Sequence, residues 1–345
     1  ALDSHLSVGG LALSWIGALF PEEVGPLAGS ASGWAVLTGS ASAPKLDGHL
    51  DLVSLFVPGQ VWGLNLAADL KSVDQGLSVL AQVSDQADQV FVLRGTVPAD
   101  LNVESPGLRP DQAVDLELLV QETSFAQLSN LFLFLGPLPG GYLSGEADVS
   151  GSVRAPILNM SLGTRLAVGT PAKWVRLDAD LSMDDSGLLR LQGGGHERED
   201  RLLDMGGRAK LDLAAFTAWM FEEGPEPNFS EPEQWLSQVN ISLVPLRVHT
   251  DVLRVFTDLP EGLNGRLTGA IALFGNLHTP QVSGALQLTE AQVGGLALEP
   301  AVVSLGPQED GYAMSGLFGF RESADVVHSF AVSGFVPFSL GTASD

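Results

Sequence analysis

The sequence contains no cysteine, and this absence excludes disulfide bonds, thiolate metal sites and cysteine nucleophiles. Basic residues are also scarce: 17 lysines and arginines stand against 41 aspartates and glutamates, a formal net charge of −24. Binding to a phosphate backbone requires clustered basic side chains, so this balance excludes nucleic acid as a main partner. Long hydrophobic runs are missing too, because none approaches the ~18 residues that a membrane-spanning helix needs.

Apolar and small residues dominate what is present. Hydrophobic residues make up 45% of the 345 residues and charged residues only 17%, and the mean hydropathy is +0.22. Since no run can span a bilayer, this apolar surplus must be buried in the protein, against a partner or against a ligand. The N-terminal "ALDSHLSV" lacks the pattern of a signal peptide, and we expect the chain to be an internal segment of a longer protein.

Three stretches of the chain, 27–52, 141–162 and 263–288, share one pattern of glycine and proline. Aligned on their prolines, they carry glycines five, eleven and fifteen residues earlier. The prolines are Pro44, Pro156 and Pro280. Their intervals are much longer than the ~20–50 residues of solenoid repeats. The pattern therefore indicates three large repeats.

Each stretch follows a segment whose apolar residues recur at helical spacing, which predicts short helices at about 13–20, 124–133 and 250–257. Elsewhere apolar and polar residues alternate, as is typical of strands with one dry face. We predict a mainly β, antiparallel fold in one continuous elongated domain, with repeat units at 1–122, 123–248 and 249–345. The acidic, proline-rich segment at about 214–236 is predicted to be an insertion.

The alternation assigns a set of apolar residues to the dry face of this sheet. These residues are Leu50, Leu52, Leu116, Leu118, Val175, Leu177, Leu181, Leu267, Ile271, Leu273, Leu286 and Leu288. Glycines inside strands permit bends, so the sheet is expected to curve into an open groove that these residues line. The same composition also fits a sandwich in which dry faces pack together. Both arrangements remain open at this level.

Each repeat combines a short helix, spaced glycines, a proline and alternating strands, and Gly-x-Val-Pro motifs close the pattern at 95–98 and 334–337. This combination resembles the TamB and AsmA-like family of bridge-like lipid transfer proteins. The resemblance covers essentially the whole chain; Met160 departs from it, where the other two copies have Gly48 and Gly284. It implies a long β-taco with an apolar concave face, located in the periplasm. It also implies transfer of glycerophospholipid towards the outer membrane, with a BamA-like barrel partner and an inner-membrane anchor outside this segment.

No constellation of residues indicates catalysis or a cofactor. The segment "GGGHERED" at 193–200 gathers His196 with acidic residues, but neighbours on one extended loop rarely converge on one metal ion. We interpret it as a charged loop between strands, and we expect no enzyme, no cofactor and no metal site.

A lipid conduit is the leading functional hypothesis, with phospholipid acyl chains lying against the dry face. Moving an acyl chain from a bilayer into such a groove exchanges one apolar setting for another, at ~0.8 kcal/mol per CH₂ in either direction. No energy source is then required of the protein itself. The alternatives are a structural or adhesive extended β protein and a chaperone-like module that offers strand edges to outer-membrane proteins.

Overall fold

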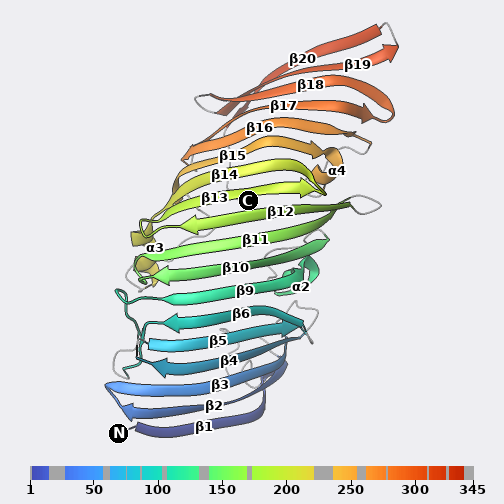
Figure 1. Ribbon diagram of the computed structural model, residues 1–345. Coiled ribbons are helices and arrows are strands. Elements are labelled where there is room, and N and C mark those ends of the chain that lie inside the picture. Colours follow the sequence, from blue (N-terminus) through green and yellow to red (C-terminus); the bar gives the residue numbers. More distant parts are fainter. Residues whose placement is uncertain are drawn as a thin grey trace. The chain divides into compact units, whose positions relative to one another are not determined.

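The structure is a computed structural model, and it describes residues 2–14, 28–56, 63–74, 76–85, 88–102, 107–131, 140–168, 173–220, 236–254, 262–276, 279–308, 311–323 and 326–337. Antiparallel strands dominate these residues (Figure 1). Contacts divide the chain into two compact units, which are described separately. The first unit is Ala1–Thr164 with Ser182–Gly187 and Met220–Glu223, and the second is Arg165–Leu181, Leu188–Trp219 and Gly224–Asp345.

The first unit is built from long strands that pair in chain order. They are β1 (Leu2–Ala12), β2 (Ala28–Ser40), β3 (Ala43–Phe56), β4 (Leu64–Val73), β5 (Gly76–Asp85), β6 (Asp88–Val97), β9 (Asp115–Ser124), β10 (Gly141–Gly151) and the part of β11 (Pro156–Val168) up to Thr164. The short strands β7 (Ala99–Asp100) and β8 (Gly107–Leu108) form a separate two-stranded sheet. Helix α2 (Phe125–Leu131) connects β9 to β10.

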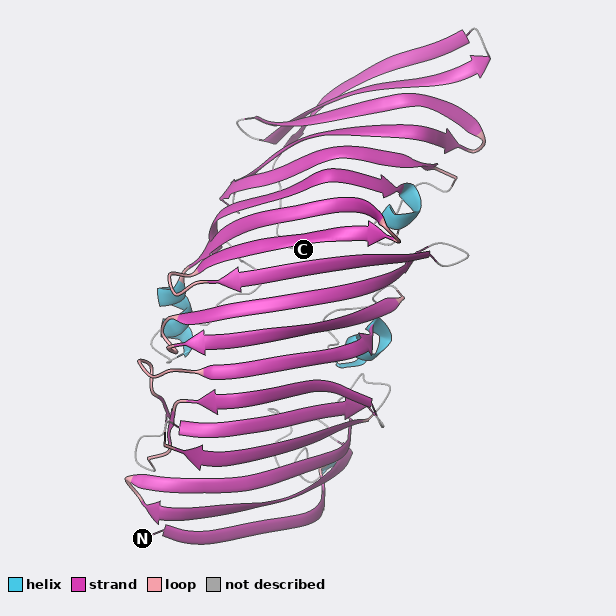
Figure 2. Ribbon diagram, in the orientation of Figure 1, coloured by secondary structure: helices cyan, strands magenta, loops and turns pink. Residues whose placement is uncertain are grey.

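The second unit repeats this plan of neighbouring antiparallel strands. They are the end of β11 from Arg165, β12 (Lys173–Met183) up to Leu181, β13 (Leu188–Glu197), β14 (Asp200–Leu211), β15 (Leu236–His249), β16 (Asn264–Asn276), β17 (Thr279–Val293), β18 (Leu296–Gln308), β19 (Gly311–Ser323) and β20 (Val326–Pro337). Helix α3 (Leu213–Met220) follows β14, and α4 (Thr250–Leu253) connects β15 to β16. Figure 2 shows these short helices at the ends of strands.

Within each unit, the described long strands contact one another along the ladder of hydrogen-bonded neighbours. The close backbone contacts of a described long strand are with its neighbours in the ladder or with a short element beside it, such as α2 beside β9 and β10 or α4 beside β15 and β16. The predicted mainly β, antiparallel fold with a few short helices is confirmed.

The glycine and proline of each repeated stretch lie on either side of a hairpin turn. Gly39 pairs with Pro44 at the end of β2 and the start of β3, and Gly275 pairs with Pro280 between β16 and β17. In the middle stretch, β10 ends at its glycine and β11 begins at its proline. Proline lacks the N–H that a ladder needs, so it is suited to the first position of a strand.

The glycine eleven residues before each proline lies inside a strand, close to the backbone of the next strand. A Cβ at Gly145 would lie 2.6 Å from the carbonyl oxygen of Ser161. The equivalent Cβ atoms at Gly33 and Gly269 would collide with the carbonyl oxygens of His49 and Ala285. Only glycine permits so close an approach without a shift of the backbone. These glycines therefore bend the strands without ending them.

Some expected features fall partly outside the described residues. Helix α2 lies within the range expected for the second helix, and α4 begins where the third was expected. Residues 15–20 of the first expected helix, 255–257 of the third and 221–235 of the insertion are outside the described part of the chain. Helix α3 occupies the start of that insertion. The division into three repeats stays a prediction, and its limits differ from those of the two units.

Candidate functional site

The strand register of the second unit brings the predicted apolar residues of β16 and β17 to one face. Leu267 pairs with Leu288, and Leu273 pairs with Val282. Ile271 lies between them on the same face of β16, because side chains alternate along a strand. Residues directly opposite each other across two strands share a face, so these predicted positions form one continuous surface.

The same face continues across the neighbouring strands of this unit. Ile241 pairs with Leu273, and Gly207 pairs with Ile241 on one side and with Leu191 on the other. On β12, Leu177 lies within 2.8 Å of a Cβ added at Gly195, which places its side chain on this face. We call this set the second apolar face. It comprises Val175, Leu177, Leu181, Leu191, Met205, Ile241, Leu243, Leu267, Ile271, Leu273, Leu286, Leu288, Val303, Leu305 and Met314.

The first unit has an equivalent surface, and it contains the four remaining predicted residues. Leu50 pairs with Gly33 and Ala68, and the register carries this face across the ladder to Leu118, which pairs with Leu93. We call it the first apolar face. It comprises Leu46, Leu50, Leu52, Leu66, Leu70, Val79, Val83, Phe91, Leu93, Leu116, Leu118 and Val149.

The opposite face of each sheet carries ion pairs, across two strands in the first unit and along one strand in the second. In the first unit, the guanidinium of Arg94 donates two hydrogen bonds to the carboxylate of Glu117, at 2.8 and 2.7 Å. In the second, Arg176 Nε donates to Asp178 Oδ1 at 2.8 Å. Apolar side chains also occur on this face, since Leu119 lies two residues from Glu117 and Trp174 two residues from Arg176, and both are exposed.

A hollow of about 380 Å³ opens on the first apolar face, and Leu50 is part of its lining. The lining comes from β1 to β4 and includes Leu6, Val8 and Leu70. Leu6 is 64% exposed and Leu50 42%. Sequence reasoning found Leu50 but missed the β1 residues, although the spacing of Leu6 and Val8 already carried the alternation that would have identified them.

The predicted residues differ in exposure. Val175 is buried, with only 1% of its surface exposed, whereas Leu50 is exposed and the other ten are half-buried. Such a surface offers no acid, base or nucleophile. It can lower its free energy by covering apolar area, at about 25 cal/mol per Å².

One buried carboxylate lies at the margin of the first apolar face. Asp85, at the end of β5, is 6% exposed and pairs in register with Leu64. Gln127 of α2 donates from Nε2 to Asp85 Oδ2 at 3.2 Å. The Gln127 side chain also accepts hydrogen bonds from the backbone and the hydroxyl of Ser124, the reciprocal arrangement of a capping box. Asp85 thus fixes the start of α2 beside the sheet, a role that the sequence did not reveal.

On the polar face of the first unit, two carboxylates flank one histidine. His49 Nδ1 lies 2.6 Å from Asp69 Oδ1, and Nε2 lies 2.8 Å from Asp51 Oδ2. The hydrogen bond with Asp69, and next that with Asp51, raise the pKa of His49 above its ordinary 6.5. The protonated ring therefore joins β3 to β4 on the side away from the apolar face.

The segment at 193–200 is mostly strand and not the expected loop: residues 193–197 end β13 and Asp200 begins β14, so only Arg198 and Glu199 form the hairpin tip. Among the described residues, no group of three or more histidines and acids could hold a metal ion. No helix in the described part of the chain is long and apolar enough to cross a membrane. No known protein family, curated protein or solved structure matches the chain.

Proposed function

We propose that the two apolar faces bind the acyl chains of glycerophospholipids and that the chain is part of a lipid-transfer conduit. The observation that carries this proposal is the apolar register of each face, whose predicted residues other than Val175 are half-buried or exposed. An apolar face of this kind requires a cover. Hydrocarbon chains are a suitable cover because they need no hydrogen bonds.

Local crowding supports a groove that is concave on the apolar side. A Cβ added at Gly207, on the second apolar face, would lie 3.1 Å from both Asn240 O and Ile241 Cγ1. At its neighbour Gly206, on the polar face, the nearest atom would be Ser242 Oγ at 3.8 Å. The backbone of β15 therefore approaches β14 closely at Gly207, as it does where glycine marks a bend in a strand. A trough formed in this way matches the elongated β-taco that the family resemblance implies.

The energetics of such a groove need no catalytic site. An acyl chain that leaves a bilayer loses ~0.8 kcal/mol per CH₂ and regains a similar amount against leucine and valine side chains. The exchange is near balance, so lipid can move down a concentration gradient along the face. The protein then acts as a passive slide and not as an enzyme.

The cellular setting of this proposal rests on the resemblance to the TamB and AsmA-like family. It is the periplasm, with lipid moving towards the outer membrane, an inner-membrane anchor beyond this segment and a BamA-like barrel as partner. The acidic surface, with its net charge of −24, keeps so apolar a chain in solution.

The test is native mass spectrometry of the purified chain, followed by transfer of a fluorescent phospholipid between donor and acceptor vesicles. We expect co-purified phospholipid and transfer that rises with protein concentration. A protein free of lipid that also fails to accelerate transfer would exclude the conduit. A structural or adhesive role would then be favoured, and capture of unfolded outer-membrane strands in place of lipid would favour the chaperone-like role.

A further inference from the structure

We propose that β20 docks a second copy of this chain, and that the two copies of β20 pair edge to edge as antiparallel strands. β20 is the last described strand of the second unit (Figure 1), and among the described strands it pairs in register with β19 alone. Every residue from Val327 to Phe335 is exposed. The free edge of β20 therefore presents backbone N–H and C=O groups that another strand can bind.

The side chains of β20 are apolar on both faces of the sheet. Phe330 lies on the side of the second apolar face, where it stacks on Phe318 of β19 with ring centroids 5.4 Å apart. Val327 and Phe335 lie on the opposite side, because side chains alternate along a strand, and they are 51% and 47% exposed. A strand that is apolar on both faces is typical of the interior of a sheet and not of its edge. β20 is therefore suited to a neighbour on its open side.

The edge strand of the first unit, β1, shows the contrast. It carries Asp3, and its register with β2 shifts between Val8 and Leu11. Charges and bulges are devices by which edge strands resist pairing with other chains. β20 contains no Asp, Glu, Lys or Arg, and its register with β19 is unbroken from Val327 to Pro337. The devices that protect β1 are thus missing from β20.

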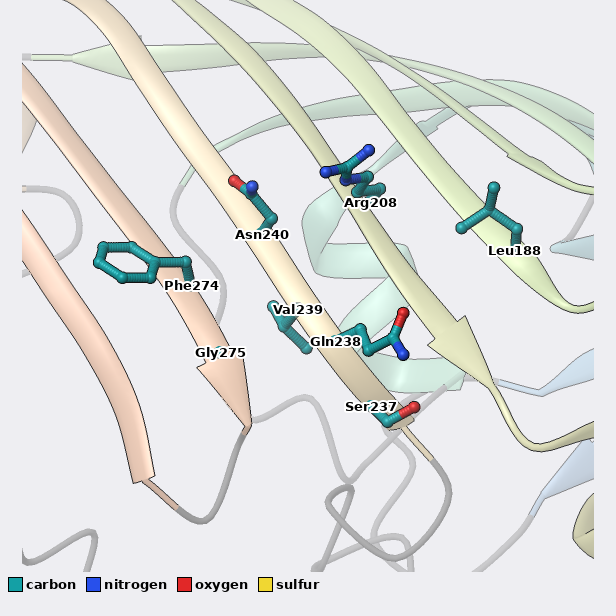
Figure 3. Close-up of a pocket in the computed structure, with 8 residues that line it drawn as sticks. All are labelled: Leu188, Arg208, Ser237, Gln238, Val239, Asn240, Phe274 and Gly275. Atoms are coloured by element: carbon teal, nitrogen blue, oxygen red, sulfur yellow. The ribbon is translucent and has the colours of Figure 1, made fainter.

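The charge of the chain favours a second copy as the occupant of this edge. The net charge of −24 makes two copies repel each other, and inner strands of the second unit carry charged groups. Figure 3 shows one of them, Arg208 of β14, beside Asn240 of the neighbouring β15. β20 offers no charge that would attract a charged partner, and self-pairing places no like charges opposite each other. A neutral apolar strand fits this edge, and β20 itself is one.

The sequence of β20 is complementary to itself about Ala331. In an antiparallel pair centred there, the cross-strand partners are Ala331 with Ala331, Phe330 with Val332, Ser329 with Ser333, His328 with Gly334, Val327 with Phe335 and Val326 with Val336. Aromatic with β-branched residues and serine with serine are favourable cross-strand pairs. The alignment places the exposed Val327 of one copy against the exposed Phe335 of the other. It therefore covers apolar surface on both faces.

This pairing has two-fold symmetry about an axis normal to the sheet. Such an axis keeps each face of one copy on the same side as that face of the other, so the second apolar face continues across the junction. Each copy contributes its single β20 edge, and the two edges satisfy each other. The assembly therefore closes at a dimer.

The test is sedimentation velocity of the purified chain at concentrations from about 1 to 100 μM, a range that resolves a micromolar dissociation constant. We expect a reversible dimer and no larger species. Ala331→Lys places two positive charges opposite each other at the two-fold axis, so it should weaken the dimer at least ~tenfold. Ser304→Lys is the matched control, because Ser304 is exposed on the same side of the sheet but lies on β18, two strands from the edge. This control should dimerise as the wild type does.

Crosslinking provides a second measurement that does not depend on the folding of Ala331→Lys. The chain has no cysteine, so a single introduced thiol is unique. Ala331→Cys should give a covalent dimer in high yield with a short bis-maleimide, because the two thiols meet at the axis. Ser304→Cys should give little.

The proposal is overturned if the wild type sediments as a monomer over the whole range or forms aggregates of no fixed size. It is also overturned if Ala331→Lys dimerises as well as Ser304→Lys, or if the two cysteine variants crosslink equally. Neither measurement involves lipid, so the result is independent of lipid binding to the apolar faces.

Discussion

Leu273 of β16 lies between Ile241 of β15 and Val282 of β17, paired with both in register on the second apolar face. It is half-buried, so part of its side chain is accessible to solvent. Leu273→Asp should therefore block lipid passage while costing only ~1–2 kcal/mol of stability, the value of partial leucine burial. A vesicle transfer assay and a thermal melt on the same preparation measure both effects.

Thr268→Asp is the matched control for this change, because Thr268 lies on the polar face of the same strand, opposite Gln287. It should leave both transfer and melting nearly unchanged. In a packed core, Leu273→Asp would bury an unpaired charge at a cost of several kcal/mol. A collapsed melt of Leu273→Asp would thus contradict the open face.

Substitution of Gly95 in β6 tests whether close approach of neighbouring strands requires glycine. Its φ is +144°, and an added Cβ would collide with the carbonyl oxygen of Asp115 and lie 2.8 Å from Leu116 Cα. Gly95→Ala should destabilise the protein by about 1–3 kcal/mol, the usual cost of overpacking. Gly206→Ala, at an uncrowded position, should change stability by less than about 1 kcal/mol. Equal denaturation midpoints for the two variants would show that backbone crowding does not constrain the sheet.

The hydrogen bonds of His49 with Asp51 and Asp69 predict that the stability of the fold depends on pH. The folded pKa of His49 is raised above its ordinary 6.5, so the stabilisation is fully present below about pH 6.5 and is lost as the pH rises through the folded value. The difference in melting temperature between wild type and His49→Gln should be largest at pH 5.5–6.5 and should shrink above it. The same comparison with His5→Gln provides the control. A difference in melting temperature that stays constant from pH 5.5 to 9 would mean that the hydrogen bonds of His49 do not stabilise the fold.

The apolar faces were predictable from the sequence because side-chain alternation is a local property of strands. Residues as distant in the chain as Val175 and Leu288 share a face since each strand keeps its own period of two. The start of α2 was also predictable from nearby residues, because Ser124 and Gln127 form its N-terminal cap.

The sequence did not predict features that depend on register. Arg190 meets Arg208 only because of the particular alignment of β13 with β14, and the bulge at Gln238 decides which residues of β15 lie beside them. The burial of Asp85 likewise depends on where α2 docks. Each of these results from strand pairing over tens of residues, which local patterns do not encode.

Photo-crosslinking from two adjacent residues of β16 tests the central claim most directly. Ile271 lies on the second apolar face, and Ala270 lies on the polar face opposite Ala285. A photo-reactive residue at Ile271 should capture phospholipid, whereas one at Ala270 should capture little, and the pair Leu177 and Arg176 should repeat this contrast on β12. Mass spectrometry of the crosslinked chain gives the yield at each position. Lipid adducts confined to Ile271 and Leu177 are the predicted result, and equal capture from both faces would contradict the account.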